Sequence, residues 1–204
     1  MQKNKKIAKI LLDIGCVNIN FRKPFLLTSG KLSPVYVDCR KLISFPKERK
    51  IIINEMIKQI RLKYKKKIYV AGGETAGIPY AALISEKIQQ PMIYIRKQPK
   101  GFGKGKLIEG EFIKNTTSVL IEDMATDAGS KLHFVKSLRA NKLIIKDIFV
   151  AFFYGVYKNA DLNLKKMNVN LNYLATWHDI VSVSHNYLSQ KDQKKLEDYI
   201  SSIN

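Results

Sequence analysis

Apolar segments of strand length alternate along this chain with segments of helical periodicity. The strand-like segments are KIYVAGG (67–73), PMIYIRK (91–97), TTSVLIED (116–123) and IKDIFVAFFYG (145–155). The helix-like segments, with apolar residues at steps of three and four, are PKERKIIINEMIKQIRLKY (46–64), GIPYAALISEKIQQ (77–90) and SKLHFVKSLRAN (130–141). The strands lack a regular apolar and polar alternation, which is typical of parallel strands buried on both faces. The sequence therefore predicts an α/β fold with a central, mostly parallel sheet flanked by helices.

The length of the chain and its first residues indicate the domain organisation. With 204 residues and 46% hydrophobic content the chain can bury one substantial core, so residues 1–204 are expected to form a single domain. A short amphipathic helix and two strands around a Ser-Gly turn in FLLTSGKLSPVYVDCR (25–40) precede the alternating region.

No apolar run reaches the ~18 residues of a membrane span, and Asp13 interrupts the apolar part of the basic N-terminus, which argues against a signal peptide. Cys16 and Cys39 form no CxxC pair, so we expect a reduced, cytoplasmic setting.

The net charge of +19 is the most unusual feature of the composition. Such an excess of Lys and Arg attracts polyanions, so nucleic acid has to be considered as a partner. The lysines are spread over the whole chain, however, whereas a nucleic-acid footprint should cluster on one element. The distribution favours a solvated basic surface, and we expect no specific nucleic-acid partner.

The segment VLIEDMATDAGSK (119–131) places two adjacent carboxylates before a loop of small and hydroxylated residues. Glu122 and Asp123 are expected where a buried strand ends, at the edge of the sheet where ligands bind. Two carboxylates there can accept hydrogen bonds from a vicinal diol such as a ribose, or from metal-bound water. Residues 125–130 offer backbone N–H groups to an anion, and the following helix start favours a phosphate. A plain turn with Ser130 as the helix N-cap is the alternative.

Two further loops have a composition suited to anions. In VAGGETAGIP (70–79), small residues let backbone amides close on a diphosphate, although such glycines can also serve the turn alone. RKQPKGFGKGKLIEG (96–110) is rich in cations and glycines. It can be a basic surface loop, a nucleic-acid contact, or a lid that closes over a polyphosphate. The chain contains neither GxxxxGK[ST] nor GxGxxG, which argues against P-loop and dinucleotide-binding folds.

Together, the acid pair with its phosphate loop, the diphosphate loop and the basic lid resemble the type I phosphoribosyltransferases. Within that fold, LLTSGKLSPVYVDCRKL (26–42) is similar to the N-terminal hood of the orotate phosphoribosyltransferase family, with the hood contributed by about residues 1–45. The resemblance extends from Phe25 to about Gly155. It implies a Mg²⁺-dependent glycosyltransferase (pentosyltransferase) that moves ribose 5-phosphate from phosphoribosyl pyrophosphate to orotate. The products would be orotidine 5′-monophosphate and pyrophosphate, in pyrimidine (UMP) biosynthesis.

The resemblance also implies roles for individual residues. The expected catalytic residues are Lys100, Glu122 and Asp123, with Lys100 on a lid that acts in trans within a homodimer. No residue is expected to bind the metal directly, because Mg²⁺ would come with the substrate and meet Glu122 and Asp123 through water. The residues implied in binding phosphoribosyl pyrophosphate are Thr75, Ala76, Arg96, Lys97, Lys100, Glu122, Asp123, Met124, Ala125, Thr126, Asp127, Ala128, Gly129 and Ser130. Those implied in binding orotate are Lys31, Tyr36, Val37 and Thr126.

Several positions depart from the family pattern. Ala128 stands where many relatives have Gly, and a left-handed backbone there would cost about 1 kcal/mol relative to Gly. Thr28 replaces a base-contacting Lys, so that Lys31 or backbone groups would have to serve, and Phe102 replaces a lid His. No Arg for the orotate carboxylate follows the strand 148–155.

Two other functions remain open on the sequence alone. The first is a phosphoribosyltransferase of the same fold that acts on another base, against which the hood sequence argues. The second is a non-catalytic regulator that binds nucleic acid, which the charge allows and the intact lid and acid pair disfavour. No metal-ligand spacing connects His133, His178 and His185, so we interpret them as helix or surface residues.

Overall fold

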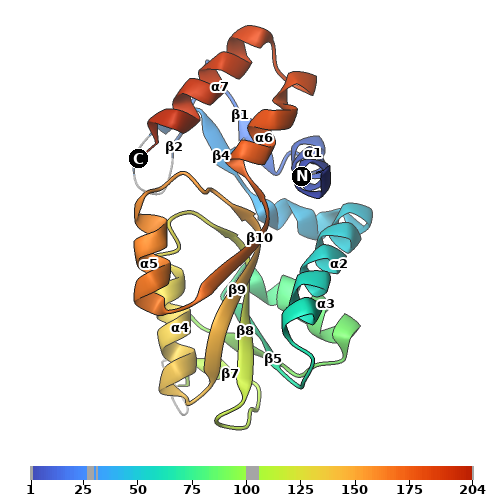
Figure 1. The fold of residues 1–204 in the computed structure, drawn as a ribbon, viewed down its shortest axis with the longest axis vertical. Coiled ribbons are helices and arrows are strands. Elements are labelled where there is room, and N and C mark those ends of the chain that lie inside the picture. The colour runs from blue at the N-terminus through green and yellow to red at the C-terminus, as the bar shows by residue number, and fades with distance from the viewer. Residues whose placement is uncertain (1, 27–29, 31, 100–105, 204) are drawn as a thin grey trace.

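The computed structural model of the protein describes residues 2–26, 30, 32–99 and 106–203. Its centre is a six-stranded sheet in the order β10-β9-β8-β5-β6-β7 (Figure 1). The strands are β5 (Tyr69–Gly73), β6 (Met92–Ile95), β7 (Ile108–Glu109), β8 (Thr117–Ala125), β9 (Ile144–Phe153) and β10 (Asn170–Thr176). Neighbouring strands are parallel except β6 and β7, which are antiparallel. The predicted α/β fold with a mostly parallel central sheet is confirmed.

Helices cover both faces of this sheet. α2 (Pro46–Lys63) and α3 (Gly77–Ile88) lie on one face, and α4 (Lys131–Ala140) and α5 (Asn159–Met167) lie on the other (Figure 1). Accordingly, Val119 and Ile121 of β8 pack in the core that contains α2 and α3, whereas Leu120 packs in the core that contains α4. Successive residues of a strand point to opposite faces, so a strand covered on both sides needs apolar residues at every position. Among the described helices, none is long and apolar enough to cross a membrane.

The N-terminal segment forms the hood. It contains α1 (Gln2–Asp13), β1 (Val17–Ile19), β2 (Phe25–Leu26), β3 (Leu32–Ser33), β4 (Val35–Val37) and the 3-10 helix η1 (Cys39–Ser44). β2 pairs with β3, and β4 pairs with β1, both antiparallel. The prediction of two strands within residues 25–40 was therefore incomplete, because Pro34 separates β3 from β4 and the two strands pair with different partners. The expected turn falls mostly on residues 27–29 and 31, which lie outside the described residues.

The C-terminal segment, for which the sequence suggested no role, packs against the hood. After β10 come α6 (Trp177–Val183), the 3-10 helix η2 (Ser184–Asn186) and α7 (Gln190–Ser202). α6 begins with a capping box in which Thr176 and Asp179 bond each other's backbone N–H groups. Trp177, Ile180 and Leu196 are fully buried in the same core as Ile7 and Leu11 of α1. α1 and α7 thus lie at the end of the molecule that also carries β1 and β4 (Figure 1).

Candidate active site

A cavity of about 600 Å³ opens at the carboxyl ends of β5 and β8, beneath the hood. Ligands of parallel sheets bind at this edge. Five segments contribute to the cavity: the end of β4 with η1, the β5–α3 loop, the residues after β6, the end of β8 and the start of α4. The lining residues are Val37, Asp38, Arg40, Glu74, Thr75, Ala76, Lys97, Gln98, Glu122, Asp123, Met124, Ser130, Lys131, His133 and Phe134.

The acid pair lies in this cavity, but its two members have different surroundings. Glu122 Oε2 accepts a hydrogen bond from Lys131 Nζ at 2.7 Å, and the two side chains are only 6% and 8% exposed. Asp123 Oδ1 accepts from the backbone N–H of Met124 at 2.8 Å. Burial raises the pKa of Asp123, while the positive charges of Lys131 and Arg40 act in the opposite direction. Of the two acids, Asp123 is therefore the one whose carboxylate is not already held by a buried cation.

Glycines make the space that Glu122 occupies. A Cβ atom at Gly73 would lie 1.8 Å from Glu122 Oε1, and one at Gly77 would lie 2.9 Å from the same oxygen. Within the described part of the chain, Oε1 is buried without a hydrogen-bond partner. Burial raises the pKa of Glu122 to about 7, with Lys131 opposing the shift. Gly73 and Gly77, on either side of the β5–α3 loop, therefore leave room for the Glu122 side chain, whatever else this loop binds.

In the loop 125–130, Ala128 has a φ of 60°, a left-handed conformation that is costly for a residue other than glycine. Asp127 Oδ1 accepts from the N–H of Gly129 at 3.0 Å. Ser130 directly precedes α4, and its side chain forms no capping hydrogen bond with any described residue. Ser130 lines the cavity, whereas Ala125 and Ala128 are buried in the core beneath.

The structure brings eight of the seventeen predicted site residues together. Val37, Thr75, Ala76, Lys97, Glu122, Asp123, Met124 and Ser130 line one cavity. Tyr36 packs against Phe25 with ring centroids 5.8 Å apart and accepts a hydrogen bond from Arg40 at 3.3 Å. The Arg96 guanidinium lies outside the lining, 3.9 Å from Glu109. The predicted residues Lys31 and Lys100, together with Thr28 and Phe102, lie outside the described residues.

Sequence reasoning missed several lining residues, of which Lys131 is the most instructive. A cation in the first turn of a helix is unfavourable beside the positive end of the helix dipole, unless an anion is close. The position of Lys131 in the first turn of α4 was therefore the signal that an anion lies nearby, and that anion is Glu122. His133 is an exposed helix residue as predicted, but it also lines the cavity, and its Nε2 lies 3.1 Å from the Arg96 carbonyl oxygen. No group of metal-binding side chains occurs among the described residues.

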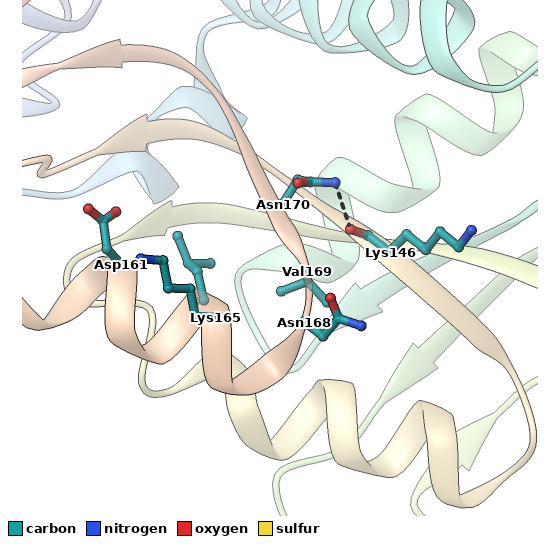
Figure 2. A pocket seen from close by; sticks show the side chains of 7 residues that line it. Lys146, Asp161, Lys165, Asn168, Val169 and Asn170 are labelled. Carbon is teal, nitrogen blue, oxygen red and sulfur yellow. Dashed lines mark hydrogen bonds between the residues drawn. The ribbon is translucent and has the colours of Figure 1, made fainter.

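A second depression, of about 540 Å³, lies along α5 at the amino ends of β9 and β10. Figure 2 shows Asp161 and Lys165 close together on α5, with Lys146 pointing away from them. Asn170 donates a hydrogen bond to the Lys146 carbonyl oxygen at 3.4 Å, which joins the two strands here. Because this depression is at the edge of the sheet opposite to the acid pair, the cavity beneath the hood is the candidate active site.

The fold and the cavity define a type I phosphoribosyltransferase, with an acid pair at the end of a central parallel strand beneath a separate hood. No protein-family model matches the sequence. The chain is 42% identical over 177 residues to orotate phosphoribosyltransferase from Ruegeria sp., an alignment that covers 86% of this chain and 78% of the relative. It is 37% identical over 200 residues to orotate phosphoribosyltransferase from Rhizobium meliloti, covering 97% and 86%. The chain belongs to the orotate phosphoribosyltransferase family.

Solved structures share the fold over most of the chain. UMP synthase from Leishmania donovani has a TM-score of 0.79 and 27% identity, and the match covers 96% of this chain but 42% of that longer protein. Orotate phosphoribosyltransferase from Aeropyrum pernix has a TM-score of 0.76 and 27% identity, covering 90% and 99%. Adenine phosphoribosyltransferase from Leishmania tarentolae, at 15% identity and a TM-score of 0.64, shares the fold alone. The fold by itself therefore does not select the base.

Proposed function

We propose that the protein transfers ribose 5-phosphate from phosphoribosyl pyrophosphate to orotate, giving orotidine 5′-monophosphate and pyrophosphate in UMP biosynthesis. The observation that carries the proposal is family membership: curated relatives at 37–42% identity, matched over most of this chain, are named orotate phosphoribosyltransferase. The cavity supports it, because its acid pair, small-residue loop and cations suit a sugar bearing a diphosphate and a phosphate.

The chemistry assigns a task to each side of the cavity. Breaking the ribosyl C1–O bond places positive charge on the sugar and negative charge on pyrophosphate, so groups that meet these charges stabilise the transition state. In this proposal Asp123 would accept hydrogen bonds from the ribose hydroxyls and face the sugar cation. On the pyrophosphate side, Thr75 and Ala76 of the β5–α3 loop line the cavity, and so does Lys97.

We propose Mg²⁺ as the cofactor, carried by the substrate. Mg²⁺ prefers oxygen ligands and keeps several waters, which suits a carboxylate pair that is reached through water. Asp123 fits this use better than Glu122, because Lys131 already holds one oxygen of Glu122 and the other is buried. When bound, the ion would neutralise charge on the leaving pyrophosphate. Turnover should stop with a chelator and return when excess Mg²⁺ is added.

The orotate ring would lie beneath the hood, beside Val37 and Tyr36 of β4. Orotate loses its ring proton readily, so the reaction demands no strong general base. His133 lies on α4, and its Nε2 is 3.1 Å from the Arg96 carbonyl oxygen. We assign it no proton transfer.

We further propose a cytoplasmic homodimer in which the lid carrying Lys100 closes over the partner's site. Cys16 and Cys39 are buried free thiols, and a reduced compartment would keep them so. The test mixes two inactive variants, Lys100→Ala and Asp123→Asn. A mixed dimer then has one site with both lesions and one with neither, so activity should recover toward about a quarter of wild type after random exchange. Absence of recovery despite proven subunit exchange would mean that Lys100 serves its own subunit.

The test of the proposed function is base selectivity. The purified protein, with Mg²⁺ and phosphoribosyl pyrophosphate, should consume orotate but not uracil, hypoxanthine or adenine. Turnover of a purine in place of orotate would identify a phosphoribosyltransferase for another base. Absence of turnover with every base, together with sequence-selective DNA binding, would instead support the non-catalytic regulator.

A further inference from the structure

The loop 125–130 is held from outside by a side chain of α5. Asn163 Nδ2 donates a hydrogen bond to the backbone carbonyl of Asp127 at 2.8 Å, in a half-buried position. From the same helix, Asn159 Nδ2 lies 3.4 Å from Asp127 Oδ2. Neither asparagine lines the cavity, and of residues 125–130 only Ser130 does, so both contacts hold the loop from α5 and not from the cavity.

The contact with the Asp127 carbonyl determines where the next N–H group points. The peptide unit is planar, and in the trans form its C=O and N–H groups point in opposite directions. A carbonyl held toward α5 therefore directs the N–H of Ala128 away from α5. Within the described residues this N–H donates to no acceptor, although Ala128 is only 1% exposed. Buried backbone N–H groups are almost always paired, so this one is poised for a partner that arrives with a ligand.

The loop would not hold this orientation by backbone preference. Ala128 has a φ of 60°, a conformation that an L-residue rarely adopts. The internal bonds of the loop, from the Gly129 N–H and the Thr126 hydroxyl, both end on Asp127 Oδ1 and leave the Asp127 carbonyl to Asn163. Gly129 also lies close to this contact, because a Cβ atom there would be 3.4 Å from Asn163 Nδ2.

We propose that Asn163 is a positioning residue that orients the loop 125–130, and the N–H of Ala128 in particular, for the 5-phosphate of phosphoribosyl pyrophosphate. The proposal rests on the proposed function for the identity of the substrate. The contact itself, and the orientation of the peptide, are independent of which base is used. Asn163 touches no reacting atom, so its effect should appear in the binding of the phosphorylated substrate.

The experiment compares Asn163→Leu and Asn163→Asp with Leu162→Ala. Leucine keeps the approximate volume and aspartate keeps the shape, but neither can donate to the Asp127 carbonyl. Leu162 is 57% exposed on the same helix and serves as the matched control. We expect the KM for phosphoribosyl pyrophosphate to rise about tenfold in both Asn163 variants, the factor that corresponds to about 1.4 kcal/mol. The KM for orotate should stay within about twofold of wild type, because a lost rear contact removes ground-state binding of one substrate only.

Two results would overturn the proposal. One is an unchanged KM for phosphoribosyl pyrophosphate in both variants. The other is a parallel rise of both KM values with a lowered unfolding midpoint, which would make Asn163 a structural residue only. Titration with ribose 5-phosphate separates this proposal from the proposed function. If the wild type binds ribose 5-phosphate but turns over no orotate, the proposed function fails, while weaker ribose 5-phosphate binding by Asn163→Leu still supports the role of Asn163.

Discussion

Ala128 shows how a single residue stores strain beside a ligand loop. Its φ of 60° is accessible to glycine without cost, whereas for alanine it costs roughly 1–2 kcal/mol. Replacing Ala128 by Gly removes this cost but also removes a buried methyl group worth about 0.8 kcal/mol. We therefore expect Ala128→Gly to raise the free energy of unfolding by up to about 1 kcal/mol, measured by urea denaturation. Ala82→Gly, at an exposed position inside α3, should lower it by about 0.5–1 kcal/mol. A loss of stability in Ala128→Gly would show that methyl packing outweighs the strain.

Asp123 is the acid whose negative charge we propose to stabilise the transition state. Asp123→Asn keeps the shape of the side chain but removes the anion that would face the developing sugar cation. We expect kcat to fall by about 100-fold, as for other groups that act mainly in the transition state, while the KM changes little. Steady-state kinetics and an unfolding curve on the same preparation distinguish the alternatives. Unchanged turnover with a lower melting temperature would reduce Asp123 to a structural role.

At the scale of elements, α7 joins the end of the chain to the hood. Tyr199 and Ser33 share a hydrogen bond of 2.9 Å between their hydroxyl oxygens, and Ser33 Oγ also donates to the Val35 carbonyl at 2.7 Å. Only Pro34 separates Ser33 from β4, the strand that we place beside orotate. Tyr199→Phe should therefore loosen β4. We expect the KM for orotate to rise about two- to tenfold, with little change for phosphoribosyl pyrophosphate. Tyr187→Phe, which removes the hydroxyl contact with Asp13, is the matched control and should leave both values unchanged.

Asp147 of β9 joins the end of α2 and β10 at one buried carboxylate. Burial alone would raise the pKa of Asp147, but hydrogen bonds from Lys63, Tyr64 and Asn172 outweigh it and hold the pKa below its ordinary value. A depressed pKa in the folded state means that the carboxylate stabilises the fold at neutral pH. This contribution is lost as the pH falls from about 4 through the folded-state pKa.

We expect Asp147→Asn to lower the free energy of unfolding at pH 7 by about 1.5–3 kcal/mol, because hydrogen bonds to a charged group are lost. The difference from wild type should shrink as the pH falls below about 4, because the unfolded chain takes up a proton at this carboxylate before the folded chain does, its folded-state pKa being lowered. Denaturation curves at pH 7, 5, 4 and 3 measure the trend. Asp198→Asn, at an exposed position of α7, is the control and should change the free energy of unfolding at pH 7 only slightly. A constant difference for Asp147→Asn would contradict the assigned pKa shift.

The elements that could be predicted from the sequence are those whose pattern is local. β8 carries the apolar run 119–121 because both its faces are covered, and α2 starts at Pro46 with Glu48 in its first turn, so both could be recognised directly. The pairing of β1 with β4 and the packing of α6 on α1 depend on contacts between distant segments. No local pattern encodes such contacts. At the site, Glu122 and Asp123 are adjacent in the sequence and could be recognised there. Lys131 contacts Glu122 only because of the geometry of the β8–α4 turn, which the sequence does not show.

At the scale of the whole molecule, the charge of +19 is distributed over several surfaces. Arg61, Lys65 and Lys66 gather at the end of α2, whereas Lys146 and Lys165 lie along α5 on the other face of the sheet. The cavity holds Lys97 and Lys131 beside its acids. A polyanion could meet one of these groups at a time but could not span all of them, so charge alone gives no specific footprint.

This distribution predicts nonspecific, salt-sensitive DNA binding. Duplex DNA should bind with a Kd of about 10⁻⁴ to 10⁻⁶ M near physiological salt, and the affinity should fall steeply between about 50 and 200 mM salt because counterion release drives binding. Fluorescence anisotropy with several unrelated duplexes of equal length measures both the slope and the sequence dependence. Phosphoribosyl pyrophosphate should compete with DNA only weakly, because most of the basic groups lie away from the cavity. Binding that stays tight at physiological salt and prefers one duplex would show that the basic surface is a built interface, and the regulator function would then replace the interpretation of a solvated surface.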